Sequence, residues 1–184
     1  MKKKDHVYKL GDTFTTIIAV PNIGVKSESQ LIDDLRRISD VVHIQAVEPN
    51  IVYGINHILG ILKVTLESER RKITFTNRIE MDFLLRLVCT DQISSALKYG
   101  GIKNGLQACF VIFSKDRKEL LRVSRHVQKL FFIHHYTDNN SLLKPTEAKK
   151  KLISNNIGLT TAKIFDNRKF VKYLLERGAL ITRY

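Results

Sequence analysis

The chain has 184 residues, of which 43% are hydrophobic, so it can bury a sizeable core as one domain and is not globally disordered. Lys and Arg number 31 against 18 Asp and Glu, which gives a net charge of +13 and a pI near 9.8. This excess favours a polyanionic partner, most commonly a nucleic acid. The alternative is a charged, solvated surface without a partner.

Membrane and secretory segments are not expected from the pattern of apolar residues. The start, MKKKDHVYKLGD, is basic but is followed by no apolar stretch typical of a signal peptide. No apolar run approaches the roughly 20 residues needed to span a bilayer. Cys89 and Cys109 fall in apolar runs without CxxC spacing, which is typical of buried, reduced thiols. We therefore expect a soluble, cytoplasmic protein that contacts no membrane.

Apolar periodicity and turn residues predict helices and strands along most of the chain. In chain order they are a strand (Phe14–Val20), a helix (Ser27–Ser39), a strand (Val41–Val47) with His43 and Gln45 on a solvated face, a helix (Ile55–Leu66), an extended segment (Ile73–Thr76), a central helix starting at Asn77, a short helix from Asp91 to Gly100, a buried strand (Ala108–Phe113), a helix (Lys118–Leu130), an edge strand (Phe131–Tyr136), a short helix (Thr146–Ile153), a helix (Lys169–Arg177) and a final strand (Ala179–Thr182). The segment Leu159–Phe165 is ambiguous between a strand and a loop. This order predicts an α/β (α+β) fold, in which several helices pack on a mixed, mainly antiparallel sheet.

The last long helices carry their own boundary signals. Ser114 and Asp116 are candidate caps of the helix Lys118–Leu130, whose predicted inward residues are Leu120, Val123, Val127 and Leu130. Asp166 is the predicted cap of the helix Lys169–Arg177, and Gly178 is its predicted stop.

The stretch from Arg70 to Lys103 holds the clearest local signals. Asn77 followed by Glu80 is close to a capping box, which predicts the start of the central helix. Its predicted buried stripe is Ile79, Phe83, Leu84, Leu87 and Val88, widened by Met81 and Leu85, while Arg78, Asp82 and Arg86 share the remaining face. In the next helix, Asp91 is the predicted cap, Ile93, Ala96 and Leu97 point inward, and Gly100-Gly101 is the stop.

No sequence motif of a known catalytic or cofactor-binding site is found. P-loop, GxGxxG, GxSxG and HExxH patterns are absent, and the adjacent His134 and His135 would point to opposite faces of a strand. We expect no catalytic residue, metal or cofactor. Two basic clusters remain, at Arg70–Lys72 and at Lys149–Lys151. The first lies beside the helix start at Asn77, where cations and free backbone N–H groups would together hold phosphates.

The central stretch resembles the kinase-associated small subunit of the KEOPS complex, the PRPK-binding protein family. The resemblance rests on NRIEMDFLLRLVC, on QISSALKYGGIK and on the aliphatic strand ACFVIF that follows; the helix with Asn56-His57-Ile58-Leu59 is also similar. It is strongest over residues 41–130 of one domain spanning 1–184. Residues 138–184 diverge from the family, although YLLERGALI is similar to its closing helix and strand.

The resemblance implies a non-catalytic subunit that binds and activates the atypical kinase (an ATPase) of KEOPS, and through it reaches the threonylcarbamoyl transferase subunit. Archaeal-type members also capture tRNA by its single-stranded 3′ CCA end, so that the complex modifies the adenosine beside the anticodon. Carried onto this chain, the RNA-binding residues would be Arg70, Arg71, Lys72, Asn77 and Arg78, with Arg86 and Lys103 as further candidates, and the kinase-contact residues would be Val171, Leu174 and Leu175. Phe75 lies inside this basic segment and is a candidate for stacking on an RNA base, with a core position as the alternative. The alternative is a protein-interaction regulator of the kinase that binds no RNA.

Overall fold

The computed structural model describes residues 6–24, 28–103, 107–131, 139–160 and 165–181. Their contacts divide the chain into two compact units, each built from two separate segments. The sheet unit comprises Met1–Val47 and Ile102–Ser141, and the helical unit comprises Glu48–Gly101 and Leu142–Tyr184. The prediction of one KEOPS-like domain over residues 1–184 stays a prediction.

The sheet unit is built on four antiparallel strands. They are β1 (Tyr8–Leu10), β2 (Thr13–Val20), β3 (His43–Val47) and β4 (Ala108–Ser114), in the spatial order β1-β2-β4-β3. Every residue of β4 is buried, as expected for the predicted central strand, because β4 pairs with β2 on one side and β3 on the other. The sheet is antiparallel throughout rather than mixed.

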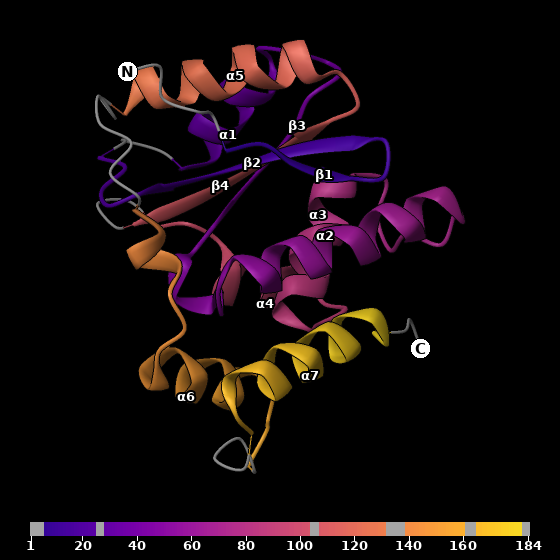
Figure 1. Cartoon of the computed structure of the whole chain (residues 1–184), viewed down its shortest axis with the longest axis vertical. Helices are drawn as coiled ribbons and strands as arrows, with labels where there is room; N and C mark the ends of the chain where they lie inside the picture. Colours follow the sequence, from indigo (N-terminus) through magenta and orange to yellow (C-terminus); the bar gives the residue numbers. More distant parts are fainter. Residues whose placement is uncertain (1–5, 25–27, 104–106, 132–138, 161–164, 182–184) are drawn as a thin grey trace. The chain divides into compact units, whose positions relative to one another are not determined.

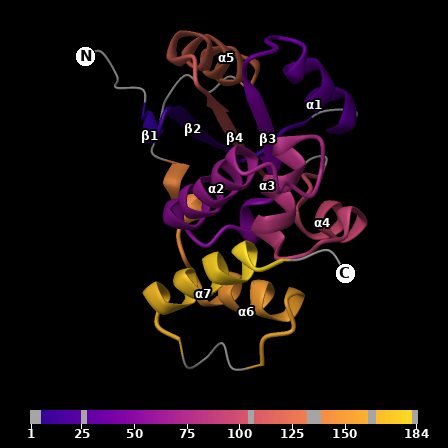
Figure 2. The same ribbon diagram turned by 90° about the vertical axis from the view of Figure 1, so that its right-hand side faces the viewer.

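Two helices cover one face of this sheet, α1 (Glu28–Arg36) and α5 (Arg117–Leu130), as Figures 1 and 2 show. Alternate strand residues such as Ile18, Ile44 and Phe110 point to that face, since strand side chains alternate with a period of two. The helices contribute Leu31, Leu35, Leu120, Val123 and Val127 to the same core. The α+β class predicted from the sequence is therefore confirmed.

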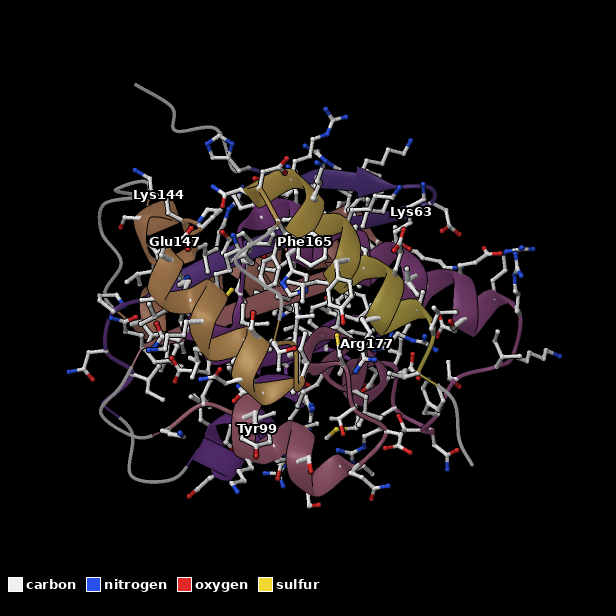
Figure 3. The ribbon with its side chains drawn as sticks, turned by 90° about the horizontal axis from the view of Figure 1, so that it is seen from below. Lys63, Tyr99, Lys144, Glu147, Phe165 and Arg177 are labelled. Atoms are coloured by element: carbon white, nitrogen blue, oxygen red, sulfur yellow. The ribbon has the colours of Figure 1, made fainter. Side chains whose placement is uncertain are left out.

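The helical unit consists of α2 (Ile55–Arg70), α3 (Ile79–Val88), α4 (Ile93–Gly100), α6 (Glu147–Asn156) and α7 (Asn167–Ala179). Short 3-10 helices also occur at Pro49–Ile51 and Asn139–Leu143. α6 and α7 lie side by side (Figure 2) and share a core in which Tyr53 meets Phe170 edge to face at 4.8 Å. Phe165, labelled between α6 and α7 in Figure 3, stacks on Tyr173 of α7.

Three helix starts are fixed by the side chains that the sequence pattern favours. Asp116 accepts hydrogen bonds from the backbone N–H groups of Lys118 and Glu119 at the start of α5. Thr146 caps α6 and Asp166 caps α7 in the same way. The predictions of Asp116 and Asp166 as caps are confirmed.

Several local predictions of burial or exposure are wrong, because tertiary packing decides which face of an element is covered. Gln45 is buried rather than solvated. Of the three residues of α4 predicted to point inward, only Ala96 is buried, whereas Ile93 and Leu97 are 47% and 49% exposed. Leu130 at the end of α5, also predicted to point inward, is exposed. A short helix that packs through small residues needs little inward surface: a Cβ on Gly100 would lie 2.6 Å from Val88.

Other differences concern where elements begin and end. The sequence pattern missed β1, and α2 continues to Arg70, past the predicted end at Leu66. α4 starts after Gln92 rather than being capped by Asp91. Gly178 lies inside α7, and Ala179 ends that helix instead of opening a strand. The edge strand predicted at Phe131–Tyr136 lies, from residue 132 on, outside the described residues.

In the described part of the chain, no helix combines the length and the apolar character that crossing a membrane requires.

Candidate nucleic-acid interface

The connection between α2 and α3, residues Arg71–Arg78, begins with a tight helix ending. The N–H of Lys72 donates to the carbonyl of Glu69, and the N–H of Ile73 donates to that of Ser68. This pair of bonds forms a Schellman motif and places Lys72 in the left-handed region, at φ 59°. Glycine is the usual residue there, because a Cβ is disfavoured in that conformation. A lysine is thus held at a position where the backbone favours glycine.

The two arginines before Lys72 share one acid. Glu67 accepts bonds from Arg70 Nε at 2.8 Å and Nη2 at 2.6 Å, and from Arg71 Nε at 2.6 Å. These bonds lower the pKa of Glu67 from 4.5 to about 2, so the carboxylate stays ionised. All three side chains are exposed, and exposed ion pairs of this kind contribute little to stability and are screened by salt. The predicted cations are present, but part of their charge is already neutralised.

Asn77 does not cap α3, contrary to the sequence prediction. The helix starts one residue later, Arg78 occupies the N-cap position, and no side chain there accepts a capping bond. The first turn carries Glu80 and Asp82, whose charges already suit the positive end of the helix dipole. This helix end is therefore a weaker anion site than expected. Asn77 and Arg78 are nevertheless both exposed.

Arg86 lies in the interior rather than on an open face, which corrects the prediction for Asp82 and Arg86. Their side chains are 0% and 3% exposed, and Arg86 Nε bonds Asp82 Oδ2 at 2.7 Å. Asp82 Oδ1 also accepts from the N–H of Phe75 at 2.7 Å, and Arg86 donates to the carbonyl of Gly178 at 3.1 Å. The buried pair therefore fastens the α2–α3 connection to α3 and to the end of α7.

Phe75 is held against this pair. The guanidinium carbon of Arg86 lies 4.7 Å from the centre of the Phe75 ring, and the ring is only partly buried. One part of the ring is thus used by Arg86, while its exposed part is available for stacking. Sequence reasoning noted the i, i+4 spacing of Asp82 and Arg86, but that spacing is also common on solvated faces.

The predicted RNA-binding residues thus fall into three groups. Arg70, Arg71, Lys72, Asn77 and Arg78 are exposed at the end of α2 and along the α2–α3 connection, with Phe75 partly exposed among them. Arg86 is buried beneath that connection. Lys103 is exposed but belongs to the sheet unit, so it is not part of the connection.

The predicted kinase-contact residues lie on α7. Leu174 is fully buried in the core with Tyr53 and Phe170, so it offers no surface to a partner. Leu175 packs on α2, because a Cβ on Gly60 would lie 2.5 Å from its side chain. Val171 and Leu175 keep partial exposure.

The second basic cluster, Lys149–Lys151, does not form a phosphate site. Lys149 and Lys150 are 7% and 6% exposed. The Lys149 ammonium donates to the carbonyls of Val52 and Leu142, and that of Lys150 donates to Phe165. These lysines hold the α6 region together, and only Lys151 is exposed. The sequence gives no signal for this burial.

The burial of polar groups in the helical unit was also not predicted from the sequence, and His57 is the main example. The pKa of His57 is lowered from 6.5 to about 3 because burial disfavours its charged form. Its Nδ1 accepts the N–H of Tyr53 at 3.3 Å, which places the ring proton on Nε2. This histidine organises the start of α2 and does not face solvent.

No group of three or more His, Cys, Asp or Glu that would hold a metal ion occurs among the described residues, which do not include His134 and His135. No protein-family model matches the chain, and no curated protein matches it.

Proposed function

We propose that this chain is a non-catalytic, tRNA-recruiting subunit of a KEOPS-type complex, which binds and activates the atypical kinase. The resemblance of residues 41–130 to that family supports the proposal, and so does the net charge of +13. In this proposal the α2–α3 connection receives the single-stranded 3′ CCA end of tRNA. The kinase is contacted by the exposed side of α7 beside Val171.

The observation that carries the RNA-binding part is the left-handed conformation of Lys72. A non-glycine residue there costs on the order of 1 kcal/mol, and glycine would remove this cost. A backbone cost retained at one exposed cation is expected where the charge itself is needed. Arg71 and Arg78 flank this lysine along the same connection and supply further positive charge.

Single-stranded RNA needs cations for its phosphates and flat or apolar surfaces for its bases. The phosphates of the CCA end would lie along Arg71, Lys72 and Arg78. One base would stack on the exposed part of Phe75, and the amide of Asn77 would hydrogen-bond a base edge. Arg86 would act indirectly, by holding Phe75 in place.

The test is binding of full-length tRNA compared with tRNA trimmed of its 3′ CCA. We expect trimming to weaken binding to the wild-type protein, and the double variant Arg71→Gln/Lys72→Gln to bind both RNAs equally weakly. The matched control is Lys98→Gln/Lys151→Gln, which removes two exposed charges elsewhere in the helical unit. Equal affinity of the wild type for both RNAs would exclude CCA capture.

A single substitution separates charge from fold at this site. Lys72→Gly should raise the free energy of unfolding by about 1 kcal/mol, because it relieves the left-handed residue. The same variant should weaken tRNA binding, since it removes a phosphate contact. A stabilised variant with unchanged tRNA affinity would show that Lys72 is not a contact.

The second candidate function is a regulator of the kinase that binds no RNA. It is favoured by the pairing of Arg70 and Arg71 with Glu67 and by the burial of Arg86, which leave fewer available cations than the sequence suggested. The purified protein would then fail to retain tRNA on a gel, yet would still stimulate the ATPase activity of the kinase. Retention of tRNA by the protein alone would exclude this candidate.

A further inference from the structure

The positive charge of the chain is concentrated in its second half. Residues 1–101 hold 14 basic and 12 acidic residues, whereas residues 102–184 hold 17 basic and 6 acidic residues. The α2–α3 connection, Arg71–Arg78, contributes three basic residues and no acid, and one of the three, Arg71, is paired with Glu67. A larger local excess lies on α5 of the sheet unit, where Arg117–Leu130 contains five Lys or Arg and one acid, Glu119.

Four of these cations form one stripe along α5. Lys118, Arg122, Arg125 and Lys129 are all exposed and follow i, i+4, i+7, i+11 spacing. At 3.6 residues per turn they fall within about 60° of one another around the helix, and they extend over roughly 16 Å. We call this set the α5 stripe; α5 itself is seen along its length in Figure 1.

The rest of the unit holds this stripe rigidly. Leu120, Val123 and Val127, on the opposite side of the helix, are fully buried against the sheet. Asp116 fixes the first turn by accepting two backbone hydrogen bonds. The spacing of the cations is therefore set by the fold and not by a flexible segment.

Glu119 pairs with one cation of the stripe, Arg122. This carboxylate bonds Arg122 at 2.7 Å, and Arg122 also donates to the carbonyl of Ile38 at 3.0 Å. The neighbouring α1 differs, because Asp33 and Asp34 face Arg36 and Arg37 across ion pairs of 3.9 and 3.4 Å. The two helices on the same side of the sheet thus differ in charge, since α1 holds three acids and one base, whereas α5 holds one acid and five bases.

We propose that the α5 stripe binds the phosphate backbone of double-stranded RNA. A straight, rigid row of cations fits the regular phosphates of a duplex, of which one strand presents about five over 16 Å. Residues 117–130 include no Phe, Tyr or Trp, so this face lacks the stacking surface that single strands need. The site is separate from the α2–α3 connection; only the choice of RNA over DNA rests on the proposed function.

An anionic membrane is the competing polyanion. A basic amphipathic helix binds lipid by inserting its apolar face, but the apolar face of α5 is buried in the core of the sheet unit. The stripe offers charge alone, which suits a surface of fixed phosphates better than a fluid interface. RNA is therefore the partner that the geometry favours.

The experiment measures binding of the full chain to a blunt RNA duplex of about 16 base pairs, which has no single-stranded end, over roughly 50–200 mM salt. We expect log K to fall with log salt with a slope near −3, for about three net phosphate contacts. Lys118→Gln/Lys129→Gln should lose at least about tenfold in affinity and reduce the slope by about 2. Lys9→Gln/Arg37→Gln, which removes two exposed charges from the same unit, should behave as the wild type.

Three results would overturn the proposal. They are equal duplex binding by the α5 variant and the Lys9/Arg37 control, tighter binding of a DNA duplex of the same length, and α5-dependent binding of vesicles containing anionic lipid without duplex binding. Arg71→Gln/Lys72→Gln should leave blunt-duplex binding unchanged. The α5 variant should likewise keep the difference between intact and CCA-trimmed tRNA, so failure of one proposal is distinguishable from failure of the other.

Discussion

The buried ion pair of Asp82 and Arg86 gives the sharpest test of how the helical unit is held together. Removing either partner leaves the other charge in the interior without compensation, which typically costs 3–5 kcal/mol. Asp82→Leu additionally leaves the N–H of Phe75 without its acceptor, and Arg86→Met leaves the carbonyl of Gly178 without its donor. Since whole domains are stable by only about 5–15 kcal/mol, each single variant should lose a large part of its stability.

The double variant Asp82→Leu/Arg86→Met should lose less than the two single variants combined. An apolar pair of similar volume removes both buried charges at once and is often neutral or stabilising by about 1–4 kcal/mol. Against this, the two orphaned backbone groups together cost on the order of 2–6 kcal/mol, unless water reaches them. We therefore expect the double variant to remain less stable than the wild type but to show a favourable coupling of about 2 kcal/mol or more.

Urea unfolding followed by far-ultraviolet circular dichroism measures these free energies in a chain without Trp. The slope of free energy against urea must stay constant among the four proteins for the comparison to hold. Single-variant losses under about 1 kcal/mol, or strictly additive losses, would refute the reasoning, because both would mean that the pair is solvated and uncoupled.

Three further predictions concern buried groups of the helical unit. His57 is neutral in the folded protein, where its pKa is about 3, but it is protonated in the unfolded chain below pH 6.5. The free energy of unfolding should therefore fall as the pH drops from 6.5 toward 3, by up to about 1.4 kcal/mol per pH unit. In urea titrations His57→Asn should flatten this pH dependence, and the same pH dependence in the variant and the wild type would contradict the prediction. Burial raises the pKa of Cys89 to about 11, although part of the residue is exposed. A thiol reagent at pH 8 should therefore label Cys89 slowly until urea unfolds the chain, because the thiolate is the reactive form. Rapid labelling of Cys89 in the folded protein would contradict this prediction. Gly178→Ala should lower the melting temperature, because the new Cβ would lie 2.6 Å from the carbonyl oxygen of Arg86. This contact should outweigh the higher helix propensity of alanine. A raised melting temperature would show that α7 moves to relieve the contact.

The sequence was most informative where local chemistry decides the structure. The apolar run Ala108–Phe113 predicted a central strand, and β4 occupies that place because such a run is covered on both faces. Asp116 and Asp166 predicted helix starts, since a short acceptor side chain satisfies the free N–H groups of the first turn. Periodicity also identified Val123 and Val127 as core residues.

Charged residues were predicted less well, because their burial depends on partners that are distant in sequence. Lys149 and Lys150 look like a surface cluster in the sequence. In the structure both are buried, with Lys149 donating to the carbonyl of Val52 and Lys150 to that of Phe165. Arg86 looked exposed from its spacing to Asp82, but Gly178 and Phe75 enclose it. A helical wheel reports which residues share a face and not what covers that face.

The candidate interface also combines features that the sequence predicts with features that only the tertiary structure decides. The sequence by itself predicted that a basic segment at Arg70–Lys72 lies between two helices, since the apolar period stops before it and resumes after it. Only the tertiary structure decided which of its cations remain available. Glu67 binds Arg70 and Arg71, the core takes Arg86, and a Schellman ending fixes Lys72 in a left-handed conformation. The physical reason is that the charge of a residue is set by its chemistry, whereas its availability depends on the ion pairs and burial that folding imposes.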